Sequence, residues 1–174
     1  MPGIITLHLG DITSDERADA IVNAANSSLL GGGGVDGAIH RAAGSEILDE
    51  CRRHGGCETG DAKLTGAGRL AAKCIIHAVG PVWRGGDNRE PQLLASCYGR
   101  AIELAAEHGC SRVAFPAIST GAFGYPLIDA AQIALSSTSE ALATHPTIIE
   151  ARFWLFDHSA YDTFARRLDL MDVV

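Results

Sequence analysis

The sequence contains no apolar run that approaches the ~20 residues a transmembrane helix requires, so nothing in its pattern indicates insertion into a membrane. Its five cysteines form no even, closely spaced framework, and no signal peptide is evident. Such cysteine usage is typical of reduced thiols. We therefore expect a cytoplasmic protein without structural disulfides.

Positive charge is also scarce: the sequence has 14 Lys and Arg against 21 Asp and Glu, which gives a net charge of −7. Proteins that bind nucleic acid normally carry a positive stripe, so nucleic acid is not an expected partner. An anionic ligand would have to be held by local backbone N–H groups rather than by a field of lysines.

A complete set of metal ligands is missing as well. Cys51, His54 and Cys57 follow one another at intervals of three residues, which raises the possibility of zinc. A structural zinc site needs four ligands, and no fourth residue has a suitable spacing. We therefore expect no metal and no cofactor.

The length and periodicity indicate one α/β domain. The 174 residues are enough for one full core, and no long exposed apolar stripe suggests more than a monomer. Apolar runs bounded by turn residues predict strands at residues 4–9, 20–23, 74–79, 112–117 and 149–156. Helical spacing predicts helices at residues 36–43, 45–53, 90–108, 126–144 and 159–168. Strands that alternate with helices favour a largely parallel sheet in a three-layer α/β/α sandwich, with ligands bound beyond the carboxyl ends of the strands.

The most informative segment is a run of four glycines, residues 31–34, which follows an Asn-Ala-Ala-Asn run. Glycine lets backbone N–H groups turn inward, and a glycine loop that leads into a helix N-terminus binds anions. A flexible linker is the alternative. The apolar residues 20–22 before the run and the helical pattern directly after it argue against a linker.

A second glycine-rich loop, residues 119–126, joins a predicted strand to a predicted helix. Its N–H groups would also converge on an anion, and two such loops facing each other would suit a diphosphate. Phe123 and Tyr125 are large apolar residues within this loop. For Tyr125 the alternative is a hydrophobic staple that packs onto the following helix.

Single polar residues near these loops are further candidates. Asp11 follows the first strand, where a carboxylate can accept a hydrogen bond from an exocyclic amine such as that of adenine. Thr13 and Glu16 match a capping box, which predicts a helix start that does not need Asp11.

Asp36 and His40 are four residues apart and share one helical face. For Asp36 the alternative is a helix cap or dipole partner, and for His40 a hydrogen-bonded, partly buried histidine. Asn23 and Asn26 offer donor and acceptor groups suited to a vicinal diol, with turn residues as the alternative.

Together these motifs resemble the macrodomain family, and within it the MacroD-type ADP-ribosyl hydrolases and O-acetyl-ADP-ribose deacetylases. The segments that carry the resemblance are residues 10–13, 21–26, 31–44, 76–81 and 119–126. The element order agrees over nearly the whole chain. The resemblance implies a single macrodomain over residues 1–174 with a mixed, mostly parallel central sheet.

The resemblance also implies roles for individual residues. Asp11 and Ile12 would hold adenine, and Phe156 would pack on its face, unless Phe156 is a core aromatic at a strand end. Asn26 would orient the distal ribose with Asn23 close by, and Asp36 would position or activate the attacking water beside His40. The diphosphate and distal ribose would be wrapped by Gly32, Gly33, Gly34, Val35, Ser119, Thr120, Gly121, Ala122, Phe123 and Gly124, and Tyr125 would also belong to the substrate-binding residues.

The implied activity is hydrolysis of an ester on the distal ribose of ADP-ribose, without a covalent nucleophile. The substrate would be a protein mono-ADP-ribosylated on Asp or Glu, or free O-acetyl-ADP-ribose. Activation of the water by a substrate phosphate is an alternative to activation by Asp36. The main rival is a reader module that binds ADP-ribose without cleaving it, and a third reading, binding of RNA or poly-ADP-ribose, is disfavoured by the net charge of −7.

Overall fold

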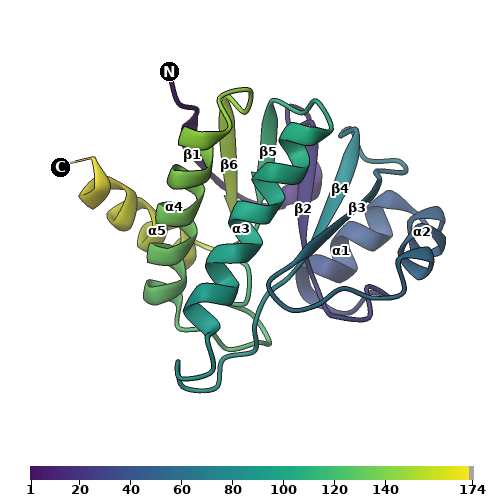
Figure 1. Cartoon of the computed structure of the whole chain (residues 1–174), viewed down its shortest axis with the longest axis horizontal. Coiled ribbons are helices and arrows are strands. Elements are labelled where there is room, and N and C mark those ends of the chain that lie inside the picture. Colours follow the sequence, from purple (N-terminus) through teal and green to yellow (C-terminus); the bar gives the residue numbers. More distant parts are fainter. Residues whose placement is uncertain (173–174) are drawn as a thin grey trace.

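The protein is built around one six-stranded sheet, seen here in a computed structural model that describes residues 1–172 (Figure 1). The strand order is β1-β6-β5-β2-β4-β3. All neighbouring strands are parallel except β3, which runs antiparallel to β4. The strands are β1 (Ile4–Leu9), β2 (Ala20–Ala25), β3 (Ala62–Gly66), β4 (Cys74–Val79), β5 (Arg112–Phe115) and β6 (Glu150–Leu155).

Helices cover both faces of this sheet. The helices are α1 (Gly34–Ala43), α2 (Glu46–His54), α3 (Glu90–Glu107), α4 (Leu127–Thr144) and α5 (His158–Met171). One core lies between the sheet and α3, α4 and α5, and a second core lies between the sheet and α1 and α2. The predicted three-layer α/β/α sandwich with a mixed, mostly parallel sheet is therefore confirmed. Within residues 1–172 no helix is both long and apolar enough to cross a membrane.

Strand alternation decides which side chains face which core. In β2, Ala20 and Val22 point into the core under α3 and α4, whereas Ile21 and Ala25 point into the core under α1 and α2. Because successive side chains alternate between faces, Asn23 lies on the α1 side. The same alternation in β4 places His77 on that side too, and the register pairs it with Asn23.

The structure differs from the predicted elements in a few places. Strand β3 was not among the predicted strands, because its short Ala-Lys-Leu-Thr-Gly sequence has only weak strand character. Strand β2 continues two residues beyond the predicted end, to Ala25, and α1 begins two residues before the predicted start, at Gly34. Strand β5 ends at Phe115 because Pro116, which follows it, has no N–H to continue the ladder.

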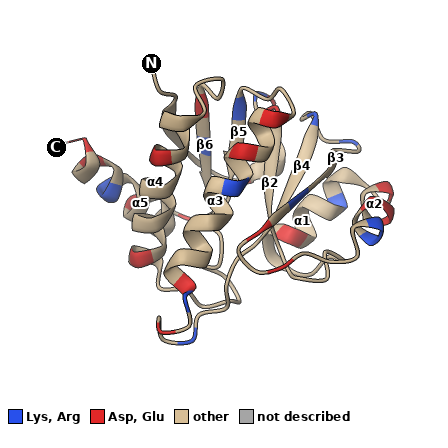
Figure 2. Ribbon diagram, in the orientation of Figure 1, with Lys and Arg blue, Asp and Glu red and all other residues tan. Residues whose placement is uncertain are grey.

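Charged residues of both signs are interspersed over the helices and loops (Figure 2). Several arginines are paired with acids: Arg52 with Asp49, Arg100 with Glu103 and Arg112 with Glu150. This pairing neutralises much of the positive charge locally.

Candidate functional site

A cleft of about 810 Å³ opens where parallel strands end. It receives residues that follow β1, the end of β2 and the start of α1, the residue after β4, and the segments that follow β5 and β6. Both glycine-rich loops contribute to this one cleft, as the strand order requires. Its lining comprises Gly10, Asp11, Ile12, Ala24, Ala25, Asn26, Gly32, Gly33, Gly34, Val35, Asp36, Ala38, Arg41, Gly80, Pro116, Ala117, Ile118, Ser119, Thr120, Gly121, Ala122, Phe123, Trp154, Leu155, Phe156, Asp157 and Ala160.

Most of the predicted site residues lie in this lining, but four do not: Asn23, His40, Gly124 and Tyr125. Arg41 was not among the predicted site residues, although it is the one Lys or Arg in the lining. Its only sequence signal is its position on α1, seven residues after Gly34 and therefore on the same helical face. A bound anion would therefore depend chiefly on backbone N–H groups.

One end of the cleft is formed by Asp11, Ile12 and Phe156. Asp11 caps a single 3-10 turn (Ile12–Ser14), and its Oδ1 accepts hydrogen bonds from the Thr13 N–H at 2.8 Å and the Thr13 hydroxyl at 2.7 Å. The expectation that Thr13 caps a helix independently of Asp11 is therefore wrong, because a side chain at the strand end reaches the free N–H groups first. The second carboxylate oxygen of Asp11 stays free for a ligand donor within the described chain.

Phe156 is not a core aromatic, since it is 84% exposed and lines the cleft immediately after β6. A large aromatic side chain with a free face in a cleft can stack on a planar ring. The high exposure of Phe156 leaves its ring accessible to a ligand, and the next residue, Asp157, also lines the cleft. This end of the cleft thus combines a carboxylate acceptor with an aromatic platform.

The glycine run forms the N-terminal end of α1. Gly33 is the capping residue and provides no side-chain hydrogen bond, so N–H groups of the first turn remain available. Gly34 has a φ of +59° and Gly31 a φ of +91°, and both angles favour glycine. The unpaired N–H groups and the helix dipole together make this end of α1 a site for an anion.

The loop after β5 supplies a second set of groups. Ser119 has a φ of +68°, which is strained for a residue with a side chain, and it is 6% exposed. Its Oγ is buried in the lining without a hydrogen-bond partner among residues 1–172. Strain and an unsatisfied hydroxyl at the same position are features of a ligand contact.

Tyr125 lies outside the cleft, which corrects its predicted role as a contact residue. Its side chain is 3% exposed and packs on Trp83 at a ring-centroid distance of 4.6 Å. The backbone N–H of Trp83 in turn donates to the backbone carbonyl of Phe123 at 2.8 Å. Tyr125 therefore anchors the loop from behind through hydrophobic packing, close to the staple alternative. Gly124 belongs to the same support, since its N–H donates to the Gly121 carbonyl.

Asp36 is the acidic group of the cleft floor. It is 5% exposed, and its Oδ1 accepts a hydrogen bond from Asn23 Nδ2 at 2.8 Å. His40 Nε2 lies 3.3 Å from the same oxygen. The other oxygen, Oδ2, faces Gly32, where an added Cβ would lie 3.1 Å from Oδ2 and 3.6 Å from Asn26 Nδ2. One carboxylate oxygen is thus held by the protein, and the other faces the cleft.

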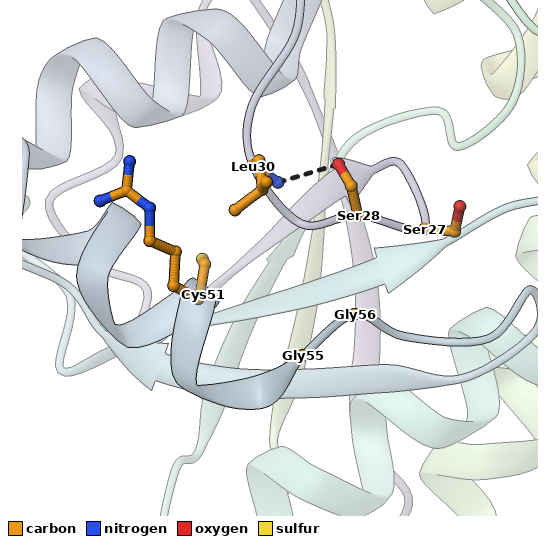
Figure 3. Close-up of a pocket in the computed structure, with 7 residues that line it drawn as sticks. Ser27, Ser28, Leu30, Cys51, Gly55 and Gly56 are labelled. Atoms are coloured by element: carbon orange, nitrogen blue, oxygen red, sulfur yellow. Dashed lines mark hydrogen bonds between the residues drawn. The ribbon is translucent and has the colours of Figure 1, made fainter.

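Asn26 is held by its own loop. Its Nδ2 donates to the carbonyl of Gly31 at 2.9 Å, and its Oδ1 accepts from the hydroxyl of Ser28 at 2.6 Å. A smaller hollow of about 400 Å³ lies against this turn, where the Leu30 N–H donates to Ser28 Oγ (Figure 3). Since its lining offers few convergent polar groups, we assign this hollow no ligand.

Asn23 and His40 lie behind Asp36 rather than in the cleft wall. Asn23 is completely buried, which corrects its predicted role as a substrate contact. Its Nδ2 also contacts His77 Nδ1 at 3.1 Å, and His77 Nε2 lies 2.9 Å from Thr65 Oγ1. His77 was missed by the sequence analysis, although a histidine within the buried run Cys74–Val79 is a signal of an internal polar contact.

The described residues offer one group of side chains that could approach a metal: His40, Cys51 and His77, whose ligand atoms lie within 4.8 Å of one another. Both ring nitrogens of His77 already have hydrogen-bond partners. Burial, together with the nearby Asp36 and Glu50 carboxylates, raises the pKa of the Cys51 thiol to about 11. Because Nδ1 and Nε2 of His77 each lie within hydrogen-bond distance of a protein group, we assign no metal to this group.

Comparison with known proteins places these features in a family. The Macro domain family matches residues 22–134. A Macro domain-containing protein of Chlorobaculum tepidum is 52% identical over 170 residues, which cover 97% of this chain and 98% of that protein. A Cronobacter sakazakii protein named O-acetyl-ADP-ribose deacetylase is 51% identical over 176 residues, which cover 99% of this chain and 97% of that protein.

Solved structures agree with the sequence matches. The Oceanobacillus iheyensis macrodomain with ADP superposes with a TM-score of 0.91 at 38% identity, covering 99% of this chain and 94% of that one. The Trypanosoma brucei macrodomain in complex with ADP-ribose gives a TM-score of 0.87 at 42% identity, covering 94% and 68%. The resemblance inferred from the glycine-rich motifs is confirmed, and the chain belongs to the Macro domain family.

Proposed function

We propose that this protein binds ADP-ribose in the cleft and hydrolyses esters on its distal ribose. The observation that carries the proposal is the arrangement of Asp36, with Oδ1 held by Asn23 and Oδ2 facing the cleft beside Asn26. A relative named O-acetyl-ADP-ribose deacetylase and a neighbour in complex with ADP-ribose support it. Removal of mono-ADP-ribose from protein Asp or Glu and deacetylation of O-acetyl-ADP-ribose are the two reactions of this class.

The binding half of the proposal follows the chemistry of the cleft. The free oxygen of Asp11 accepts from the exocyclic amine of adenine, and Phe156 stacks on the ring. The N-terminus of α1 and the loop at residues 119–124 hold the diphosphate through N–H groups. The distal ribose then lies at Asn26 and Asp36, on the floor of the same cleft.

The chemical half assigns the attacking water to Asp36 Oδ2. The carboxylate orients the water and accepts its proton while the water oxygen bonds to the acyl carbon. The ester C–O bond breaks, and the ribose recovers its hydroxyl with that proton. A positioned general base contributes about 10²–10⁴ in rate. Activation by a substrate phosphate is the alternative route and needs no carboxylate.

The test is release of ADP-ribose from two substrates, a protein mono-ADP-ribosylated on acidic residues and O-acetyl-ADP-ribose. Asp36→Ala is expected to lower kcat by about 10²–10⁴ while ADP-ribose still binds, as measured by calorimetry. Asp49→Ala removes an exposed acid on α2 and serves as the matched control. Unchanged turnover in Asp36→Ala would assign activation of the water to the substrate phosphate.

The reader function makes the opposite prediction for the wild type. A reader binds ADP-ribose at the same adenine and diphosphate contacts but releases nothing from either ester. Binding without release by the wild type, on both substrates, would therefore replace the hydrolase proposal with the reader.

A further inference from the structure

Behind the cleft lies a chain of four buried polar side chains contributed by four different elements. Thr65 comes from β3, His77 from β4, Asn23 from β2 and Asp36 from α1. None of the four is more than 5% exposed. They are brought together by the sheet register, which pairs Asn23 with His77, and by α1, which packs on β2.

The hydrogen bonds in this chain have only one consistent set of directions. A carboxylate can only accept, so Asn23 turns its Nδ2 toward Asp36 Oδ1 at 2.8 Å. The second hydrogen of the same Nδ2 points to His77 Nδ1 at 3.1 Å, so Nδ1 is an acceptor and carries no proton. Nε2 therefore carries the proton of a neutral imidazole and donates to Thr65 Oγ1 at 2.9 Å. The Thr65 hydroxyl in turn donates a hydrogen bond to the carbonyl of Gly66 at 2.9 Å.

This order means that His77 controls how Asn23 is held. Without an acceptor at Nδ1, the Asn23 amide would lose one of its two anchors and could rotate about its side-chain bonds. Asp36 Oδ1 would then lose the amide donor at 2.8 Å and keep only His40 Nε2, at 3.3 Å, as a neighbour, so the direction of Oδ2 toward Gly32 and Asn26 would be set less firmly. A base that misses its water by about 1 Å loses about 10²-fold in rate.

We propose that His77, as the neutral Nε2–H tautomer, is a positioning residue for the hydrolysis. Its Nδ1 holds the Asn23 amide by a hydrogen bond, and the Asn23 amide in turn fixes the orientation of the Asp36 carboxylate. His77 does not touch the cleft, because it is completely buried and absent from the lining. The inference rests on the proposed function of Asp36 and extends it by two residues into the core.

The electrostatics of the surroundings agree with a neutral ring. Burial first, and then the neighbouring His40, lower the pKa of His77 to about 4. Asp36 acts in the opposite direction, and His54 adds a small effect in the same direction as His40. Cys51 is the other titratable group in contact, with Sγ 3.7 Å from Nε2, and its raised pKa keeps it a neutral thiol.

The kinetic test compares three variants in the full chain. His77→Leu removes the acceptor and is expected to lower kcat for ester hydrolysis about 10- to 100-fold, with the ADP-ribose Kd within about twofold of wild type. His77→Gln restores an acceptor and a donor and is expected to recover most of the loss. Cys51→Ala is the control, since it removes a buried sulfur atom 3.7 Å from Nε2 of the same ring and leaves the contacts of Asn23 in place, and it should keep kcat within about twofold.

A spectroscopic test covers the case in which His77→Leu does not fold. Long-range 1H–15N correlation spectra of the wild type distinguish protonated from unprotonated ring nitrogens, and His77 is expected to be protonated at Nε2 alone near pH 7. A proton on Nδ1, or an unchanged kcat in folded His77→Leu, would overturn the inference. A general loss in which Cys51→Ala falls as far as His77→Leu would overturn it as well.

The two proposals fail in different ways. If the wild type binds ADP-ribose but hydrolyses no ester, the proposed function fails, and the positioning role in hydrolysis fails with it. The tautomer of His77 then still decides whether the hydrogen-bond chain exists. If the wild type is active and His77→Leu is fully active, only the positioning role fails.

Discussion

Gly32 lies two residues before the start of α1, beside the Asp36 carboxylate. A substitution there tests whether glycine is needed for the backbone conformation or for the proposed chemistry. Gly32 does not have a positive φ, so an alanine there strains no backbone angle. An added Cβ would instead lie 3.1 Å from Asp36 Oδ2 and 3.6 Å from Asn26 Nδ2. Gly32→Ala therefore inserts a methyl group between the two side chains that the proposed chemistry needs, while the fold is left almost untouched.

The size of the effect follows from those two distances. A contact of 3.1 Å is short for a methyl group, so the carboxylate must move by a few tenths of an ångström or the water must leave its place beside Oδ2. Displacements of about 1 Å cost about 10²-fold in rate, so we expect kcat to fall by about 10- to 100-fold. The free energy of unfolding should change by less than about 1 kcal/mol, because no core contact is lost.

The assay is ADP-ribose release from an ester substrate, with ADP-ribose binding and urea unfolding measured on the same preparations. Gly99→Ala is the control, because Gly99 lies within α3 with no atom within 4 Å of the added Cβ. It should leave kcat unchanged and stabilise the protein by about 0.5–1 kcal/mol. A fully active, folded Gly32→Ala would show that the attacking water does not sit between Asp36 Oδ2 and Asn26.

Three further predictions concern buried ionisable groups. Asp15→Asn removes the charge of one of the two acids paired with Arg152, at 2.8 Å from Asp15 Oδ2, while Glu150 stays in place, and should cost about 1.5–3 kcal/mol in urea unfolding; a cost below about 0.5 kcal/mol would contradict a buried, charge-assisted contact. The lowered pKa of His77, about 4, means that the unfolded chain binds a proton between pH 6.5 and pH 4 that the folded protein does not. Stability should be complete above pH 6.5 and fall by up to ~3 kcal/mol toward pH 4, a slope that His77→Gln should reduce. Glu90 accepts three backbone N–H groups from residues 84–88, so Glu90→Gln should speed amide hydrogen exchange in that segment and leave exchange in β2 unchanged.

Much of the fold could be predicted from local patterns. The strand at residues 74–79 and the helix start at residue 90 agree with β4 and α3, because long apolar periodicities bounded by turn residues are dominated by local sequence. Strand β3 was missed because its five residues contain one Lys, one Thr and one Gly and gain their pairing only from β4. Short edge strands depend on a neighbour that the local sequence does not show.

In the candidate site, too, the loops could be predicted from local sequence, whereas the contacts of single side chains could not. Both glycine-rich loops were predicted to bind a ligand, and the structure brings them to one cleft because they follow parallel strands. Tyr125 and Asn23 were predicted to contact the ligand, but both lie behind the wall of the cleft. Tyr125 packs on Trp83, and Asn23 is buried behind Asp36. Whether a loop residue faces a ligand or the core depends on its neighbours in space.

The sequence by itself determined the alternation of strands and helices, the places where glycine frees the backbone, and the spacing that puts Asp36 one turn from His40. These are properties of the local chain, set by side-chain periodicity and allowed backbone angles. Only the tertiary structure decided that β2 lies between β4 and β5, and therefore that Asn23 meets His77. Contacts between residues far apart in sequence arise from the packing of the whole sheet, because no local rule specifies which strands become neighbours.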